Sequence, residues 1–440
     1  MLKWLKKALA PSGEETVHKN FTAKNIIGML CFVLVFCLVF AGVEQLFYSD
    51  SLFSTTWNRI RSDGDVPEML IMGNSHAFCS FVPDIINGAL GVDSAVLGAS
   101  GQNAAGMVDS LAAALTRGKP NVVVVELNTF YFDFDAMPQY HKGSALGNIN
   151  GMPKIINRAR AAWHEIGFEN IPQGVTQLLR SDLMWSRWST DKKPLNRYEG
   201  NDVLGYSFMN WHAMGNFDAQ MLQAEAIEFS KSDERKSLEE KPLNELHRLF
   251  ELANQYEVEL WFVKAPTTSI SQDDIQRLND VAQIAKENCS FVTQVYDFRQ
   301  NIGDMGFEIE DFYDTGHLSR QGAAKFTAFF SAWAGKIMDI KPDYAAAFAY
   351  QSEQIDVCTE SMYRYTMNAY GEDVQYRFML GKDGKEMLVS DWSTNNSVEI
   401  ELNPQEADSL YVTMCPLHLL DQQETYALTL PFMVKNTCIL

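Results

Sequence analysis

The chain contains 440 residues, of which 46% are hydrophobic, and these values are typical of a globular protein with a sizeable core and more than one structural unit. Its 36 basic and 56 acidic residues give a formal net charge of −20. That balance repels phosphodiester backbones and argues against nucleic acid as a partner. The seven cysteines show no C-x-x-C spacing, so we expect neither a metal nor another cofactor.

An apolar segment lies near the amino terminus. Residues 26–43, IIGMLCFVLVFCLVFAGV, carry no charge, and eighteen helical residues at about 1.5 Å each span roughly the hydrocarbon core of a bilayer. We therefore predict a transmembrane helix over residues 26–47. Five lysines precede this helix: Lys3, Lys6, Lys7, Lys19 and Lys24. Because basic residues flank the cytoplasmic end of a membrane helix, we expect residues 1–25 in the cytoplasm and the remaining chain outside the membrane. A cleaved signal peptide is the alternative, although its apolar core is usually shorter and its charged leader briefer.

The next part of the chain alternates between strand and helix patterns. Residues 67–134 give a strand EMLIM, a turn GNSH, a helix MVDSLAAALTRG and a buried strand NVVVVEL. The same order returns at 239–299, where an amphipathic helix precedes the strand VELWFV, and a further helix precedes QVYDF. This alternation favours a parallel sheet covered by helices, so we predict a three-layer α/β/α domain over residues 48–344.

Two regions depart from that alternation. Residues 135–225 are rich in aromatic and basic residues without a clean strand-helix repeat, and we interpret them as an insertion that covers the functional site. Residues 345–440 contain short strand-like runs, such as YRYTMNAY and SLYVTM, separated by GKDGK and STNN. These runs predict a small β-sandwich at the carboxyl end.

Ser75 is the first candidate catalytic residue. It follows the strand EMLIM directly, within Gly73-Asn74-Ser75-His76, and a serine at a strand-to-helix turn exposes its hydroxyl at the carboxyl end of the sheet. Gly73 permits a tight turn there. Taken alone, the same serine is more typical of a helix cap.

The second candidate motif is Asp314-Thr315-Gly316-His317, which precedes an amphipathic helix through AAKFTAFFSAW. A carboxylate three residues before a histidine can orient the imidazole, so that the other ring nitrogen accepts the proton of a serine. A solvated loop with a capping Asp is the alternative for this motif alone.

Together and in this order, the two motifs resemble the SGNH/GDSL hydrolase superfamily, over roughly residues 66–338. The resemblance implies a catalytic triad of Ser75, Asp314 and His317. It also implies that the N–H of Gly101, in VLGASGQNAAG, helps to form the oxyanion hole. The third family block, an Asn in a Gly-x-Asn-Asp context, is imperfect, because Asn128 in ELNTF stands one or two places early. Either Asn128 shifts into the oxyanion hole, or only the N–H groups of Ser75 and Gly101 form it.

Weaker substrate-binding candidates are His76, beside the nucleophile, and Arg187 with Trp188, in the insertion. Aromatic faces stack on pyranose rings, and a guanidinium pairs with carboxylate or phosphate. The alternative is that these tryptophans simply pack the insertion.

The arrangement resembles the membrane-tethered proteins of alginate acetylation and teichoic acid D-alanylation. That resemblance implies an extracytoplasmic esterase or O-acyltransferase that acts on acyl, foremost acetyl, esters of cell-surface glycan. It also implies a multi-pass membrane-bound O-acyltransferase as partner. Two alternatives stay open: an esterase with small diffusible substrates, and a catalytically inactive scaffold or glycan-binding partner that keeps the fold. Loss of function without loss of folding in Ser75→Ala would exclude the scaffold.

Overall fold

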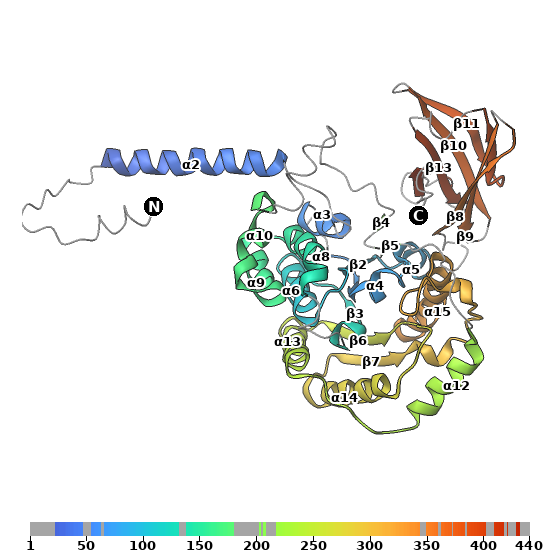
Figure 1. The fold of residues 1–440 in the computed structure, drawn as a ribbon, viewed down its shortest axis with the longest axis horizontal. Coiled ribbons are helices and arrows are strands. Elements are labelled where there is room, and N and C mark those ends of the chain that lie inside the picture. Colours follow the sequence, from blue (N-terminus) through green and yellow to red (C-terminus); the bar gives the residue numbers. More distant parts are fainter. Residues whose placement is uncertain are drawn as a thin grey trace, which may run out of the picture. The chain divides into compact units, whose positions relative to one another are not determined.

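A computed structural model of the chain describes residues 23–46, 54–62, 66–131, 138–179, 202–203, 206–207, 217–343, 349–359, 362–371, 373–382, 385–401, 409–417, 420 and 428–431. Figure 1 shows the order of their helices and strands. The predicted tail at 1–25 lies almost wholly outside these residues.

The apolar segment near the amino terminus forms helix α2 (Ala23–Leu46). Its side chains are described at residues 27–36, 38–40, 42 and 43, and nearly all of them are exposed. Over the described residues, no helix was found that is both long and apolar enough to cross a membrane. The transmembrane helix at 26–47 therefore stays a prediction.

Five parallel strands form the central sheet, in the order β2-β1-β3-β6-β7. Their bounds are β1 (Met69–Gly73), β2 (Ser94–Gly98), β3 (Val122–Glu126), β6 (Glu259–Lys264) and β7 (Val292–Asp297). Every residue of β1, β2 and β3 is buried, which is typical of a parallel sheet with both faces covered. The predicted parallel sheet is therefore confirmed.

Helices pack in two groups around this sheet. Helix α6 (Ala104–Leu115) packs on α13 (Glu240–Tyr256), which also contacts α14 (Gln272–Asn288), whereas α5 (Pro83–Leu90) packs on α15 (Arg320–Met338). Because the chain moves from β1 to β2 in one direction and from β2 to β3, β6 and β7 in the other, right-handed crossovers put these groups on opposite faces. The α/β class is confirmed.

Residues 138–179, within the predicted insertion, are mainly helical. They form α8 (Pro138–Gly151), α9 (Ile155–Ile166), the 3₁₀ turns Phe168–Asn170 and Gln177–Leu179, and α10 (Ile171–Val175). Helix α3 (Ser54–Ser62) packs on α8, where the indole N–H of Trp57 donates to Asn148 Oδ1 at 2.7 Å. Farther on, β4 (Asp202–Val203) and β5 (Tyr206–Ser207) form a short hairpin, and α12 (Ala219–Ser230) follows.

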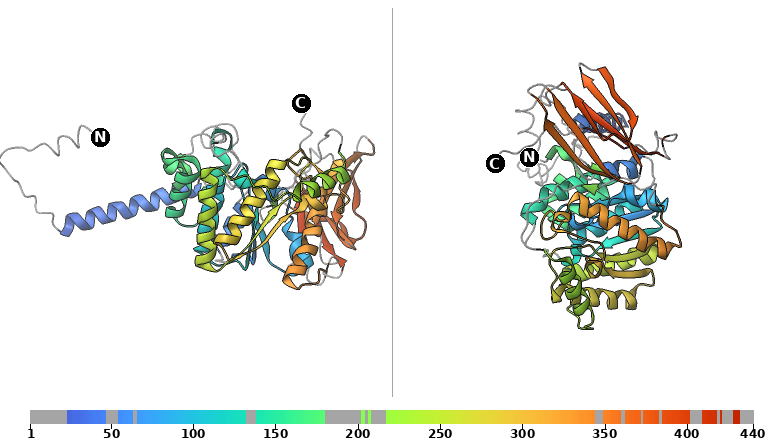
Figure 2. Two further views of the ribbon diagram at one scale, coloured as in Figure 1. Left: turned by 90° about the horizontal axis from the view of Figure 1, so that it is seen from below. Right: turned by 90° about the vertical axis from the view of Figure 1, so that its right-hand side faces the viewer.

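The carboxyl-terminal residues form two antiparallel sheets, in the orders β11-β10-β13-β14 and β12-β9-β8. The strands are β8 (Ala349–Val357), β9 (Tyr363–Tyr370), β10 (Val374–Lys382), β11 (Lys385–Ser393), β12 (Ser397–Ile400), β13 (Ser409–Pro416) and β14 (Leu428–Pro431). Figure 2 shows them as a group of their own. Tyr365 and Met367 from one sheet share a hydrophobic core with Phe378 and Val412 from the other. The predicted all-β region is confirmed at this level.

Candidate active site

Ser75 is held by the turn that ends β1. It is the first residue of the short helix α4 (Ser75–Phe78), and the buried Asn74 caps this helix by accepting the backbone N–H of His76 on Oδ1 at 3.0 Å. The carboxyl ends of β1 and β2 approach so closely that a Cβ atom added to Gly98 would lie 2.5 Å from the carbonyl oxygen of Gly73. Two glycines therefore let β1 and β2 meet directly beneath the serine.

Asp314 and His317 lie in a loop that is closed by hydrogen bonds between its own backbone groups. The N–H of Tyr313 donates to the carbonyl oxygen of His317 at 2.9 Å, and Phe312 and Leu318 form an isolated antiparallel bridge. Asp314 Oδ1 accepts the N–H of His317 at 2.9 Å. Helix α15 starts directly afterwards, so the loop is fixed to the covering layer of the sheet.

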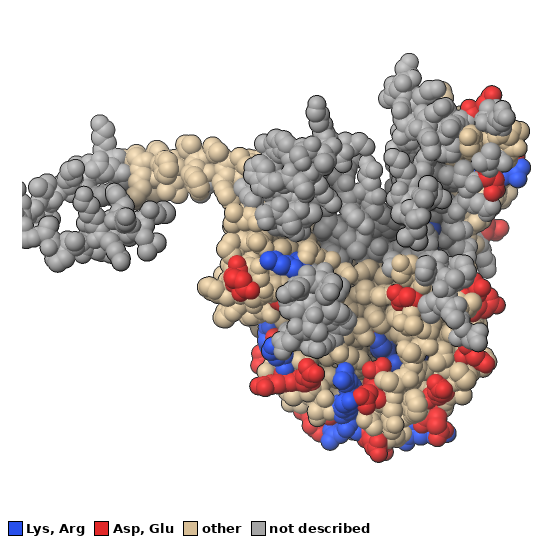
Figure 3. Space-filling model, viewed as in Figure 1, with Lys and Arg blue, Asp and Glu red and all other residues tan. Residues whose placement is uncertain are grey.

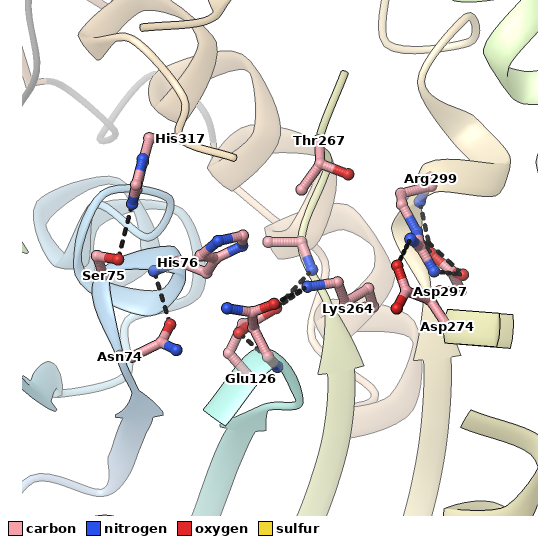
Figure 4. A network of polar contacts seen from close by, with 12 residues as sticks. Asn74, Ser75, His76, Glu126, Lys264, Thr267, Asp274, Asp297, Arg299 and His317 are labelled. Carbon is pink, nitrogen blue, oxygen red and sulfur yellow. Dashed lines mark hydrogen bonds and ion pairs between the residues drawn. The ribbon is translucent and has the colours of Figure 1, made fainter. Parts of the chain in front are cut away.

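The structure brings these two segments together although 242 positions separate Ser75 from His317. Ser75 Oγ lies 2.7 Å from His317 Nε2, and His317 Nδ1 lies 2.8 Å from both carboxylate oxygens of Asp314. Figure 4 shows the serine hydroxyl and the imidazole pointing toward one another at the carboxyl end of the sheet. This geometry suits proton transfer from a nucleophilic hydroxyl to an imidazole that a carboxylate orients.

The site lies at a special point of the topology. With β1 in the middle and connections that leave it in opposite directions, the sheet has its switch point between β1 and β3. In open α/β sheets, ligands bind in the crevice at the carboxyl ends of the strands around such a point. Ser75 follows the carboxyl end of β1 itself.

The two predicted oxyanion-hole residues lie at the carboxyl ends of the neighbouring strands. Gly101 follows β2 and has φ +62°. Asn128 follows β3, begins α7 (Asn128–Tyr131), and accepts a hydrogen bond from Lys264 Nζ on Oδ1 at 3.2 Å. Within the described part of the chain, neither residue forms a hydrogen bond with Ser75. The bond from Lys264 occupies the oxygen of the Asn128 carboxamide, which leaves its NH₂ as the end that can donate.

A buried ion pair beneath the site was not anticipated from the sequence. Lys264, the last residue of β6, donates to Glu126 Oε1 at 3.2 Å, and both side chains are buried. The other oxygen of Glu126 accepts the backbone N–H of Asn128 at 2.9 Å. One signal in the sequence could have indicated this pair. Two apolar runs, VVVVE and ELWFVK, each end in a charged residue, and they form the adjacent strands β3 and β6.

His76 lies between the triad and this ion pair in Figure 4. Burial, reinforced by the positive charges of Lys264, His317 and Arg299, holds the pKa of His76 well below 6.5. Its ring centroid is 5.2 Å from that of His317, and its buried Nδ1 has no hydrogen-bond partner among the described residues. His76 is therefore neutral at pH 7, so it places no second positive charge beside a protonated His317.

Other predicted site residues fall elsewhere. Arg187 and Trp188 lie outside the described residues. Among the residues that are described, no group of three or more His, Cys, Asp or Glu side chains is arranged to hold a metal ion.

Comparison of the chain with models of known protein families gives no match, and comparison with curated proteins gives none either.

Proposed function

We propose that the chain is an SGNH-like serine esterase or O-acyltransferase that acts on acyl esters of cell-surface glycan. The observation that carries the proposal is the continuous hydrogen-bonded chain from Ser75 through His317 to Asp314, with contacts of 2.7 and 2.8 Å. Serine, imidazole and carboxylate in this order form the arrangement that activates a hydroxyl for acyl transfer.

The chemistry runs in two halves. Ser75 Oγ attacks the ester carbonyl while its proton passes to His317 Nε2, and that proton then leaves with the departing alcohol as the acyl-enzyme forms. A second hydroxyl next gives its proton to His317 and takes the acyl group, and His317 returns that proton to Ser75 Oγ, which restores the free hydroxyl. Water as the second nucleophile makes the protein an esterase, and a sugar hydroxyl makes it an O-acyltransferase.

The oxyanion that forms in each half requires nearby donors. The backbone N–H groups of Ser75 and Gly101 and the NH₂ of Asn128 are the proposed donors. The loss of one such donor costs on the order of 10²-fold in rate. We assign the orientation of Asn128 to Lys264, which binds its carboxamide oxygen at 3.2 Å.

We further propose that residues 26–47 anchor the chain in a membrane, with residues 1–25 in the cytoplasm and the triad outside. The uncharged run at 26–43 and the lysines before it support this orientation. A protein fixed at the cell surface fits polymeric acceptors better than small diffusible esters. A multi-pass membrane-bound O-acyltransferase is the proposed source of acyl groups.

The test is labelling of the full chain in mild detergent with a fluorophosphonate probe, which reacts with activated serines. Ser75→Ala should abolish labelling and His317→Ala should slow it by about 10²-fold or more. Ser269→Ala, at an exposed position of the same domain, should leave it unchanged. A folded wild-type chain that takes no label would contradict the esterase proposal and favour the second candidate.

That second candidate is a catalytically inactive scaffold or glycan-binding partner of a membrane acyltransferase. The displaced position of Asn128 in the third block favours it. The scaffold predicts that Ser75→Ala preserves biological function, whereas the enzyme predicts its loss.

A further inference from the structure

Helix α9 carries apolar side chains on a face that no other described element covers. Ile155, Ile156 and Trp163 are 64%, 72% and 57% exposed, and Phe168, two residues beyond the helix, is 72% exposed. At 100° per residue, the first three fall within about 100° around the helix axis. We call these four residues the α9 patch. Exposed apolar clusters of this kind are typical of surfaces that bind a membrane or another protein.

The helix behind the patch is firmly held. Its opposite face buries Asn157, Ala161 and Glu165. Beside the patch, Arg160 and His164 both contact the fully buried Asp109 of α6, at 3.0 and 2.7 Å. The α9 patch is therefore displayed on a rigid element, and its side chains do not belong to the core of the domain.

The covalent path from the proposed anchor limits where this face can lie. Only residues 47–53 connect the end of α2 at Leu46 with the start of α3 at Ser54, and this connection reaches at most about 28 Å. One turn into α3, Trp57 packs directly on Gly151, where its side chain lies 2.4 Å from the position of an added Cβ. Gly151 is four residues before Ile155.

That reach is short compared with the domain, since about 300 residues fold to a body roughly 50 Å across. The start of α3 is therefore held within about 28 Å of the end of the proposed anchor, and this tether favours an arrangement in which the side of the domain that carries α3, α8 and α9 faces the membrane. In Figure 3 acidic and basic side chains alternate over α13 and α14.

We propose that the α9 patch lies in the interface of the lipid bilayer and holds the domain in a fixed orientation on the membrane. The inference rests on the proposed anchor but is independent of the acyl-transfer chemistry. Tryptophan and phenylalanine are the side chains that favour the headgroup level of bilayers. Lys154 and Glu169, the exposed charges at either end of the patch, offset one another, so the interaction is apolar rather than electrostatic.

The experiment places the photoreactive residue p-benzoylphenylalanine at position 163 of the full chain, reconstituted in phosphatidylcholine vesicles. The matched control carries it at Met221 on α12, which is 55% exposed and lies on the other side of the α/β domain (Figures 1 and 2). After irradiation, mass spectrometry counts lipid adducts. We expect at least tenfold more lipid adduct at position 163 than at position 221, and less than a twofold change when phosphatidylserine is added.

Three results would overturn the inference. Equal lipid adducts at both positions would show that α9 does not face the bilayer. Cross-links from position 163 mainly to a second copy, or to other residues of the same chain, would assign the patch to those occupants. A large increase with phosphatidylserine would make the contact electrostatic.

The same vesicles separate failure of the anchor from failure of the patch. A chain that is extracted by alkaline carbonate has no membrane anchor, and in that case the proposed anchor and the proposed membrane contact of the α9 patch are both wrong. A chain that resists extraction but gives no lipid adduct at position 163 retains its anchor, and only the patch inference fails. Fluorophosphonate labelling of Ser75 reports independently on catalysis in either case.

Discussion

The buried pair of Lys264 and Glu126 should respond very differently to single and double substitution. Lys264→Met leaves the Glu126 carboxylate buried with only backbone N–H donors from Asn128 and Ala265, at 2.9 and 3.4 Å. Removal of one partner of a buried pair costs about 3–5 kcal/mol of unfolding free energy, because the remaining charge stays desolvated. The double variant Lys264→Met/Glu126→Gln removes both charges and should cost less than about 2 kcal/mol.

Urea denaturation of the full chain in detergent measures these differences, with intrinsic tryptophan fluorescence as the reporter; the buried Trp261 on the same strand is one of its nine tryptophans. The control is Lys236→Met, which breaks an exposed pair with Asp273 and should cost far less unfolding free energy than Lys264→Met, because solvent screens this pair. The reasoning is refuted if Lys264→Met costs no more than Lys236→Met. It is also refuted if the double variant loses as much unfolding free energy as Lys264→Met and Glu126→Gln lose together when each is measured alone.

Three further predictions concern other described residues. Gly98→Ala forces a Cβ against the Gly73 carbonyl oxygen, so it should lower the free energy of unfolding by about 1–3 kcal/mol and slow probe labelling. The control is Gly143→Ala within α8, where no atom obstructs the added Cβ, and it should raise the free energy of unfolding by about 0.5–1 kcal/mol. Denaturation curves of the two variants measure this difference. Burial raises the pKa of Glu165 from 4.5 to about 8, so the folded state holds a proton that the unfolded state releases, and stability should fall as pH rises from 4.5 to 8. Glu165→Gln should flatten that decline, and an unchanged pH profile would disprove the assignment. Asp314→Asn removes the charge that orients His317 and should slow fluorophosphonate labelling by about 10² to 10⁴-fold in stopped-time assays; a loss below tenfold would contradict its role.

The sheet was predictable because its strands are short apolar runs bounded by turns. Val122 to Val125 are four β-branched residues in a row, and such a run is typical of a strand buried on both faces. The strand-like runs YRYTMNAY and SLYVTM became β9 and β13, but β8 and β11 were not predicted. In β11, Met387 and Leu388 are both half exposed, so the strand lacks the alternation of buried and exposed residues that marks a half-buried strand.

The helices of residues 138–179 were not predicted. Helix α8 contains the run GSALGNING, in which apolar residues show no helical period, so packing against Trp57 and α9 determines its conformation rather than an amphipathic pattern. Helix α9 does carry an amphipathic pattern, in which Ile155, Ile156 and Trp163 lie on the apolar side, and this signal was missed.

For the site, the sequence indicated which chemical groups to expect but not how they are supported. A serine after a strand and an Asp-x-x-His before a helix are local patterns, and the structure brings them together. Whether Lys264 turns toward Glu126 depends on the strand order β3-β6, which no local pattern contains. The neutral state of His76 likewise depends on its burial, which only the folded chain determines.

The separation of the triad into an early serine and a late, self-closed Asp-His loop has a consequence for biosynthesis. When the chain is synthesised from its amino terminus, Ser75 emerges first, and His317 follows only after 242 further positions. Until α15 docks and delivers the loop, the serine has no base beside it. In the enzyme that we propose, an incomplete or truncated chain is chemically silent, and reactivity toward esters begins only when the whole domain has closed.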